Sequence, residues 1–323
     1  MKKSFAHILG IAFCLCTTEI VKAQRTEIST TFRNINSNAY FRFHYDNDYF
    51  ANSDKYYSQG ITFDFVHPFL KKNPFNKLLW KPFTSNTQYG LSFNLFGYTP
   101  VTTASNDILY GDRPFNANLS LKTLLIQTDS IHHQNISTSF SVGVMGTVAL
   151  GKEIHVGIHR LLKNEPPLGW QHQIQNDVII NYQIQYEKQV LSLGNYFLLN
   201  AVAEARAGTL NNKLSGGINF MAGKFTKRFL PVTNKKRVEL YLYGQSKLSI
   251  IGYDASLQGG IFNRKSVYTI SAGDINRVTV QTDAGMILNM KKFYLSYSRS
   301  FLSKEFKTGK THRWGGISLG FVM

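Results

Sequence analysis

The sequence contains almost no cysteine, and the little that it has lies at one end. Of 323 residues, only Cys14 and Cys16 are cysteines. The chain beyond them offers neither a disulfide framework nor a cysteine nucleophile. Long hydrophobic runs are also missing, because no stretch approaches the ~18 consecutive apolar residues of a transmembrane helix. The sequence therefore predicts no helix that spans a bilayer.

The N-terminus has the pattern of an export signal. Lys2 and Lys3 precede an apolar run that is well below the ~20 residues of a spanning helix, and Ala23 ends a segment that fits a cleavage site. This pattern favours a cleaved signal over an uncleaved anchor. Large residues precede both cysteines, which disfavours a lipoprotein anchor. We predict a signal peptide at 1–23 and one exported domain at 24–323.

Acidic residues are few, since 19 Asp and Glu stand against 36 Lys and Arg. The first 23 residues hold three lysines and one glutamate, so the exported part has a net charge of +15. A positive charge suits an anionic partner, either phosphorylated lipid or nucleic acid. Export argues against nucleic acid. We therefore expect contact with outer-membrane lipids, and a monomer.

Aromatic residues and glycines are abundant, and apolar residues alternate with polar ones at a period of two. The chain has 24 Phe, 17 Tyr and 25 Gly but only 8 Pro. In 89–95 the odd positions are Tyr, Leu, Phe and Leu, whereas the even positions are Gly, Ser and Asn. Segments 136–144, 178–186 and 315–323 repeat this alternation. Strict alternation gives a strand one apolar face and one polar face.

Two all-β folds fit this alternation. In a soluble sandwich the apolar faces pack on each other, whereas in a membrane barrel they meet lipid and the polar faces line the lumen. Export, the missing cysteines and segments of ~9–14 residues favour a single antiparallel transmembrane β-barrel of about twelve strands. The predicted strands are 39–50, 56–68, 87–98, 117–129, 135–146, 176–190, 196–210, 213–225, 238–252, 274–290, 293–303 and 312–323.

One segment departs from the period of two. In 151–163 the residues Ile154, Ile158, Leu161 and Leu162 stand at i, i+4, i+7 and i+8, which predicts one short helix. If the N-terminus lies in the periplasm, each odd-to-even connection faces the cell exterior. The helix then lies on the extracellular side.

The same count sorts the basic residues by side. The runs 71–81 and 224–237 fall on the periplasmic side, away from the outer leaflet. Lys152, Arg160 and Lys163 fall on the extracellular side and are candidates for contact with lipopolysaccharide phosphates. A solvated role for any one of them is the simpler alternative.

His155 and His159 share one face of the predicted helix. Their i, i+4 spacing can hold zinc, with Glu165 as a third ligand. The helix lacks the His-Glu-x-x-His arrangement of a metalloprotease, because Val156 stands where the glutamate would be. The spacing alone therefore leaves a zinc site as a weak alternative.

The cluster Asp46-Asn47-Asp48 ends the first predicted strand. Asn47 has the parity of the apolar residues Phe43 and Tyr45, so we expect it to face outward from the barrel wall. A polar amide facing lipid costs free energy unless it is covered and hydrogen-bonded, and the helix at 151–163 could cover it. The simpler alternative is a pair of turn residues at a strand end.

Three separated motifs together resemble one family. They are DNDYFANSDKYYSQG at 46–60, GDRPF at 111–115 and GVMGTVALGKEIHVGIHRLLKNEPPLGWQHQ at 143–173. In order and spacing they are similar to the lipid A 3′-O-deacylases, esterases that remove an acyl chain from lipopolysaccharide. A looser similarity covers nearly the whole exported chain. The resemblance implies a twelve-stranded outer-membrane barrel with its site between the barrel wall and a helix.

The resemblance also implies roles for single residues. His159 matches the family's general base, which takes a proton from the water that attacks the ester. Asn47 and Asp48 match an Asn-Asp pair, and Glu165 matches an acidic residue. These carboxylates would hold Ca²⁺, which prefers oxygen ligands and would stabilise the oxyanion. Ser58 matches the hydroxyl of a Tyr-Thr-x-Gly motif, and we expect it to be a scaffold rather than a nucleophile.

Two departures concern the site. His155 stands where the family often has Gln, so its charge depends on pH. A lysine of some members has no counterpart near Ser105, and Asn106 or nothing takes its place. We expect Asp112 and Arg113, which are family markers, to form a structural brace. Trp170 is interpreted equally well as an aromatic anchor at the membrane interface, so we do not count it among the catalytic candidates.

The sequence leaves three functions open. The first is a calcium-dependent esterase that removes the 3′-acyloxyacyl chain of lipid A in the outer leaflet. The second is a non-catalytic structural or transport barrel of the same scaffold. The third is an esterase that acts on another acylated lipid, because no motif reads a sugar or counts acyl carbons.

Overall fold

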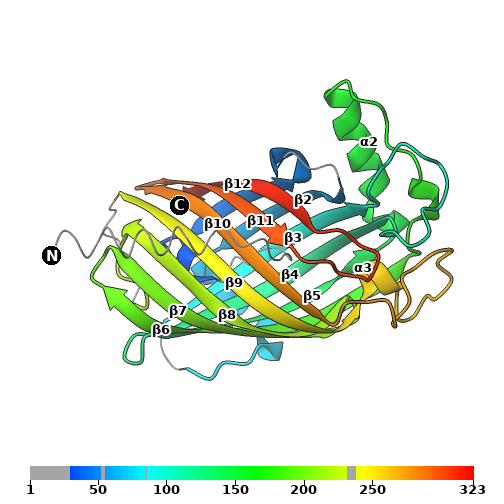
Figure 1. Ribbon diagram of the computed structural model, residues 1–323. Coiled ribbons are helices and arrows are strands. Elements are labelled where there is room, and N and C mark those ends of the chain that lie inside the picture. The colour runs from blue at the N-terminus through cyan, green and yellow to red at the C-terminus, as the bar shows by residue number, and fades with distance from the viewer. Residues whose placement is uncertain (1–29, 52–54, 84–85, 231–237) are drawn as a thin grey trace.

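The protein is a closed antiparallel barrel in which each strand pairs with its neighbours in sequence and β1 closes on β12 (Figure 1). The computed structural model describes residues 30–51, 55–83, 86–230 and 238–323. The strands are β1 (Tyr40–Asn47), β2 (Tyr56–Val66), β3 (Thr87–Thr99), β4 (Asn116–Asp129), β5 (Gln134–Met145), β6 (Asp177–Leu193), β7 (Phe197–Gly208), β8 (Asn211–Lys224), β9 (Glu239–Asp254), β10 (Val278–Met290), β11 (Phe293–Leu302) and β12 (His312–Val322). The predicted twelve-stranded barrel is confirmed. The predicted signal peptide lies outside the described residues.

The two faces of the barrel wall are inverted relative to a soluble protein. Phe63, Phe93 and Leu121 lie side by side on β2, β3 and β4, and their side chains are 39%, 40% and 49% exposed. Ser92 and Asn94, which flank Phe93, are buried in the lumen. Apolar residues therefore face outward and polar residues face inward, which is the arrangement of a membrane barrel and excludes a sandwich.

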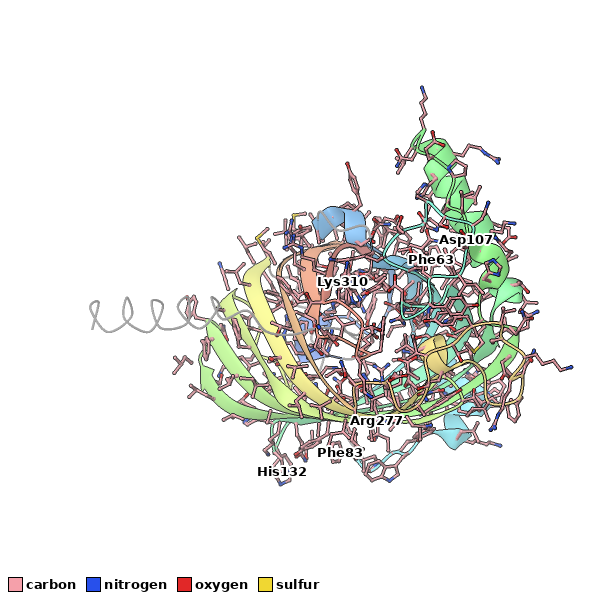
Figure 2. All side chains as sticks on the ribbon, turned by 45° about the vertical axis from the view of Figure 1, so that its right-hand side comes forward. Phe63, Phe83, Asp107, His132, Arg277 and Lys310 are labelled. Carbon is pink, nitrogen blue, oxygen red and sulfur yellow. The ribbon has the colours of Figure 1, made fainter. Side chains whose placement is uncertain are left out.

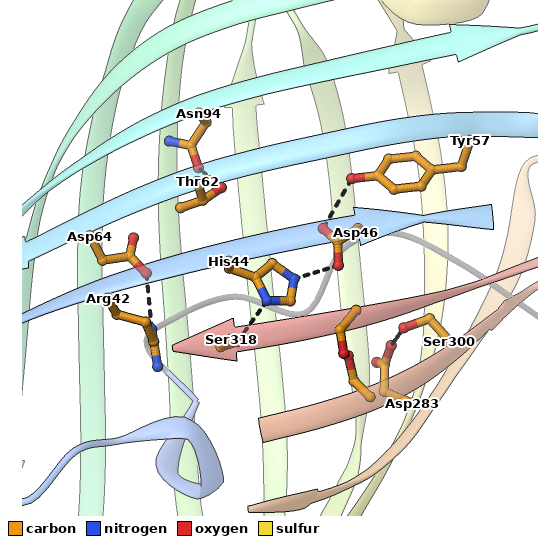
Figure 3. A network of polar contacts seen from close by, with 12 residues as sticks. Arg42, His44, Asp46, Tyr57, Thr62, Asp64, Asn94, Asp283, Ser300 and Ser318 are labelled. Carbon is orange, nitrogen blue, oxygen red and sulfur yellow. Dashed lines mark hydrogen bonds and ion pairs between the residues drawn. The ribbon is translucent and has the colours of Figure 1, made fainter. Parts of the chain in front are cut away.

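The lumen is occupied by polar side chains that contact one another (Figure 3). Arg42 forms an ion pair with Asp64 at 3.1 Å, with both side chains buried. Further along β1, His44 lies between Asp46 and Ser318, and its Nδ1 is 2.7 Å from the serine hydroxyl. A buried charge is tolerated when it is paired and hydrogen-bonded. The inward face of β1 is therefore a structural network.

A short 3-10 helix, η1 (Thr31–Arg33), fills one end of the lumen. Phe32 is fully buried and stacks on Tyr243 with a centroid distance of 4.3 Å. The hydroxyl of Tyr241, near the start of β9, donates to the carbonyl of Phe32 at 2.7 Å. We call residues 30–35 the plug. It lies at the end where β9 begins, opposite the helices described next.

Two α-helices lie at the other end, away from the C-terminus (Figure 1). Helix α2 (Gly151–Leu161) connects β5 to β6 and stands out from the barrel, and it ends two residues before the predicted end. Helix α3 (Ala255–Gln258) follows β9 and was not predicted, because four residues are too few for a periodic pattern. The predicted short helix is α2. No helix in the described ranges is long and apolar enough to cross a membrane.

Short 3-10 turns complete the connections. They are η2 (Asp48–Ala51), η3 (Pro68–Lys72), η4 (Pro74–Leu78), η5 (Thr147–Ala149) and η6 (Trp170–His172). The predicted strand bounds differ most at β10, which begins at Val278 instead of 274 because Ile275 forms only an isolated bridge to Phe306. These differences leave the pairing order unchanged.

Candidate active site

Polar and small residues gather on the outward side of three neighbouring strands, at the end that carries α2. We call this set the rim patch: Asn47, Ser58, Gln59, Gly97 and Thr99. Asn47 lies on the face of β1 that also carries Phe43 and Tyr45, so its predicted outward orientation is confirmed. Ser58 lies in a bulge, where the register of β2 against β3 shifts. The rim patch interrupts the apolar outer surface of the barrel.

Contacts within the rim patch hold two of its side chains in place. The amide nitrogen of Asn47 donates to the main-chain oxygen of Ser58, and its amide oxygen accepts from the main-chain nitrogen of Tyr49 at 2.8 Å. The hydroxyl of Ser58 is buried and lies 2.7 Å from that of Thr99. The hydroxyl of Ser58 therefore contacts another hydroxyl and not a base, which favours a scaffold role for Ser58.

Helix α2 and the segment after it cover the outer wall next to the rim patch. A Cβ at Gly151 would lie only 2.3 Å from the Cβ of Ala117, so the glycine lets the helix begin directly on β4. Trp170 packs against Phe115 with a centroid distance of 5.0 Å. Only 2% of Trp170 is exposed, so it is a buried contact between the helix segment and the wall, and the interpretation as an interfacial anchor is wrong.

His155 is held by this layer in one protonation state. The indole nitrogen of Trp170 donates to Nδ1 of His155 at 3.2 Å. Since an indole N–H can only donate, Nδ1 carries no proton and the proton is on Nε2. Burial, together with nearby His159, lowers the pKa of His155 to about 3. His155 is therefore a neutral donor, like the Gln that the family often has at this position.

His159 has the opposite arrangement. Its Nδ1 lies 2.5 Å from the main-chain oxygen of Glu165, which can only accept, so Nδ1 carries the proton. In the neutral ring, Nε2 then presents a lone pair. The ring lies 4.6 Å from that of His155 and nearly perpendicular to it, and it is partly exposed. This tautomer is the one that a general base requires.

The carboxylates that were predicted to bind metal lie on different elements. Asp48 is buried in η2, where one oxygen accepts from the main-chain nitrogen of Lys55 at 2.8 Å. Glu165 is exposed in the loop after α2. Among the residues that the structure describes, no group of three or more His, Cys, Asp or Glu side chains could hold a metal. Nδ1 of His155 is also not available to zinc, because it accepts a hydrogen bond from Trp170.

The structure thus forms two groups of predicted site residues. Asn47, Asp48 and Ser58 lie on β1, η2 and β2, whereas His155 and His159 lie on α2, which packs on β3 and β4. The helix that was predicted to cover Asn47 therefore lies about two strands away from it.

A family model described as outer membrane protein LpxR matches residues 9–323. The chain belongs to this family. The protein is accordingly an outer-membrane barrel, and the resemblance that the three motifs indicated is confirmed. The structure of LpxR from Salmonella typhimurium has a TM-score of 0.73 and 17% identity, with 88% of this chain and 100% of that chain covered. This likeness supports the fold.

A more distant solved barrel is the β domain of the Bordetella autotransporter BrkA. Its TM-score is 0.45 at 10% identity, with 88% of this chain and 98% of that chain covered, and we draw nothing from it. The search of curated proteins found no match.

The family markers Asp112 and Arg113 form the brace that we expected in this LpxR-family chain. Asp112 accepts from the main-chain nitrogen of Val101 at 2.8 Å. Arg113 pairs with Glu305 and donates to the hydroxyl of Ser256 at 2.7 Å. These contacts join the connections after β3, β9 and β11 across the mouth of the barrel.

The loop between β3 and β4 lies against the segment that follows α2. The main-chain nitrogen of Leu168 donates to the oxygen of Thr103 at 2.8 Å, and the oxygen of Asn106 contacts Gln171 and His172. Figure 2 shows Asp107 of the same loop at the end of the barrel that carries α2. Asn106, which stands near the position of the missing lysine, therefore supports this segment through its main chain.

The sequence analysis missed three members of the rim patch: Gln59, Gly97 and Thr99. A signal for Gln59 was present, since it shares the outward parity of Ile61 and Phe63 on β2. Gly97 and Thr99 share the parity of Phe93 on β3. Polar or small residues at outward positions near a strand end were thus visible, but which of them meet was not.

Proposed function

We propose that the protein is an esterase that removes the 3′-acyloxyacyl chain of lipid A in the outer leaflet, with His159 activating the water. One observation carries the proposal: a histidine with its Nδ1 proton held by a carbonyl lies on α2, the helix that packs on the outside of β3 and β4. Membership of the LpxR family and the deacylase resemblance support the same reaction. An ester in the outer leaflet reaches this face without entering the lumen.

His159 supplies both proton transfers. Nε2 accepts a proton from water as the water oxygen attacks the ester carbonyl carbon. The resulting imidazolium keeps its Nδ1–H bond to the oxygen of Glu165. Nε2 then returns a proton to the sugar oxygen as the C–O bond breaks. General base catalysis of this kind contributes ~10²–10⁴ in rate.

The other predicted residues orient the reactants. His155 stays neutral and offers its Nε2–H as a donor. Asn47 uses its amide to fix the bulge at Ser58, so its contribution is the shape of the rim patch. Lys152 and Arg160 are exposed on α2 and Lys163 follows it, and their positive charge suits the phosphates of lipid A.

Calcium dependence is part of the proposal and rests on the carboxylates of Asp48 and Glu165, which are hard oxygen donors. Bound Ca²⁺ would polarise the ester carbonyl as a Lewis acid. The side chains that the structure describes do not form a complete cage for it. The proton transfers above therefore involve His159 alone. The experiment below includes removal of calcium by chelation.

The test is hydrolysis of lipid A in mixed micelles by purified wild type and His159→Ala, with released fatty acids identified by mass spectrometry. A phospholipid with the same acyl chains tests the alternative substrate. His132→Ala is the matched control, because His132 is exposed in the turn between β4 and β5 at the plug end. We expect His159→Ala to lose ~10²–10⁴ in rate and chelation to inactivate wild type reversibly. Full activity of His159→Ala would contradict the proposal.

A further inference from the structure

Gln59 is a buried amide without a hydrogen-bond partner. Only 1% of the residue is exposed, and neither Nε2 nor Oε1 has a partner among the residues that the structure describes. Buried side-chain amides nearly always have partners, and each exception calls for an explanation. A leucine of similar size would avoid the free-energy cost of burying these two atoms. The unpaired amide therefore points to a ligand-binding role for Gln59.

The amide lies between the two groups of predicted site residues. Gln59 follows the bulge at Ser58 and pairs across the sheet with Gly97. A Cβ placed at Gly97 would lie 3.9 Å from Nε2 of Gln59 and 4.0 Å from Cη2 of Trp170. Because Gly97 has no side chain, the Gln59 amide and the Trp170 ring meet over the same point of the wall. Trp170 in turn contacts His155.

Neighbouring polar groups already have structural contacts. The amide of Asn47 holds the main chain of Ser58 and Tyr49, and the hydroxyl of Ser58 contacts Thr99. Nδ1 of His155 accepts from Trp170. Within the rim patch, Gln59 is therefore the described amide whose donor and acceptor are both uncommitted.

We propose that Gln59 is a substrate-binding residue whose Nε2 donates to the carbonyl oxygen of the ester. The inference rests on the proposed function and names how its substrate is held. As water adds to the carbonyl carbon, His159 takes the proton and the carbonyl oxygen gains the negative charge. The Gln59 N–H stabilises that oxyanion. Collapse expels the sugar oxygen, which takes the proton back from His159, and the free carboxylic acid leaves.

A ligand-binding role and a structural role predict opposite effects of Gln59→Leu. If the amide serves the substrate, the change removes two unpaired buried atoms, so the melting temperature stays the same or rises. The value of kcat should then fall by ~10²–10³-fold, the range for loss of one oxyanion donor. If the amide serves the fold, the melting temperature falls and activity follows it.

The experiment uses the full chain in detergent and measures melting temperature, kcat and KM for wild type, Gln59→Leu and Gln88→Leu. Gln88 is the matched control: it is a buried glutamine far along β3 whose Nε2 donates to the oxygen of Ser37 at 2.8 Å. Gln88→Leu should lose stability and keep kcat. For Gln59→Leu, a kcat within about threefold of wild type, or a loss of melting temperature equal to that of Gln88→Leu, would overturn the inference.

A binding measurement separates this inference from the proposed function. Intact lipid A is titrated onto His159→Ala and onto His159→Ala combined with Gln59→Leu, so that no turnover is needed. We expect the double variant to bind at least about tenfold more weakly, a change of ~1.4 kcal/mol. If wild type does not hydrolyse lipid A, the proposed function fails, and this titration alone decides the inference. Equal dissociation constants would then reject it.

Discussion

At the scale of single residues, the two histidines of α2 differ in the partner of Nδ1. Trp170 donates to His155, whereas the oxygen of Glu165 accepts from His159. Two identical side chains one helical turn apart therefore have opposite tautomers, one a fixed donor and one a base. The sequence showed both histidines and their common face, but it could not show which nitrogen each partner would engage.

His155 makes the stability of the site depend on pH. Its pKa is about 3 in the folded protein, against an ordinary value of 6.5. Between these values the unfolded state binds more protons, so the free energy of unfolding falls as the pH drops below about 6.5, by up to ~1.4 kcal/mol per pH unit. Above pH 6.5 the contribution is fully present. We expect melting temperatures at pH 7, 6 and 5 to fall less steeply in His155→Gln than in wild type.

His133→Gln is the control for this titration, because His133 is exposed in the turn between β4 and β5, far from α2. It should follow the wild-type pH profile. Parallel profiles for wild type and His155→Gln would show that the buried ring does not resist protonation.

At the scale of elements, α2 is positioned by a glycine rather than by a large interface. Gly151 lets the first turn of the helix lie on Ala117 of β4, and Trp170 closes the contact. The helical period of 151–163 predicted the helix itself. It could not predict where α2 contacts the barrel, because that depends on the contact between residues on separate elements. The same limit explains why the bulge at Ser58 was missed.

Gly151→Val should displace α2 and reduce activity while leaving the barrel folded. A Cβ at this position would lie 2.3 Å from Ala117, and a shift of about 1 Å at a catalytic group can cost ~10²-fold in rate. Activity against lipid A and heat-modifiable mobility on gels check the two parts. Gly157→Ala is the control, because a Cβ there meets nothing within 4 Å. It should keep full activity. Equal activity of both variants would refute the claim that Gly151 positions α2.

At the scale of the whole molecule, the alternation of apolar and polar residues determines the barrel. It predicted twelve strands and an inverted wall, because each outward residue must meet lipid whatever its distant partners are. The filling of the lumen was not visible, since it depends on the plug and on ion pairs such as Arg42 with Asp64. Within the lumen, a cavity of about 90 Å³ is lined by residues such as Asn94 and Arg206.

The plug should contribute to global stability. Phe32 is fully buried against Tyr243 and Tyr241, so Phe32→Ala should cost ~3–5 kcal/mol in the free energy of unfolding by urea in detergent. Phe262→Ala is the control, because Phe262 is 69% exposed. A loss no larger than that of the control would mean that the plug is not part of the folded core.

The central claim is hydrolysis of an acyl ester of lipid A by His159. Its most direct test is mass spectrometry of lipid A from cells that express wild type or His159→Ala, with and without chelation of calcium. We predict that lipid A loses one acyloxyacyl unit in cells with wild type and keeps it in cells with His159→Ala or after chelation. Unchanged lipid A in every sample, or the same loss with His159→Ala, would contradict the account.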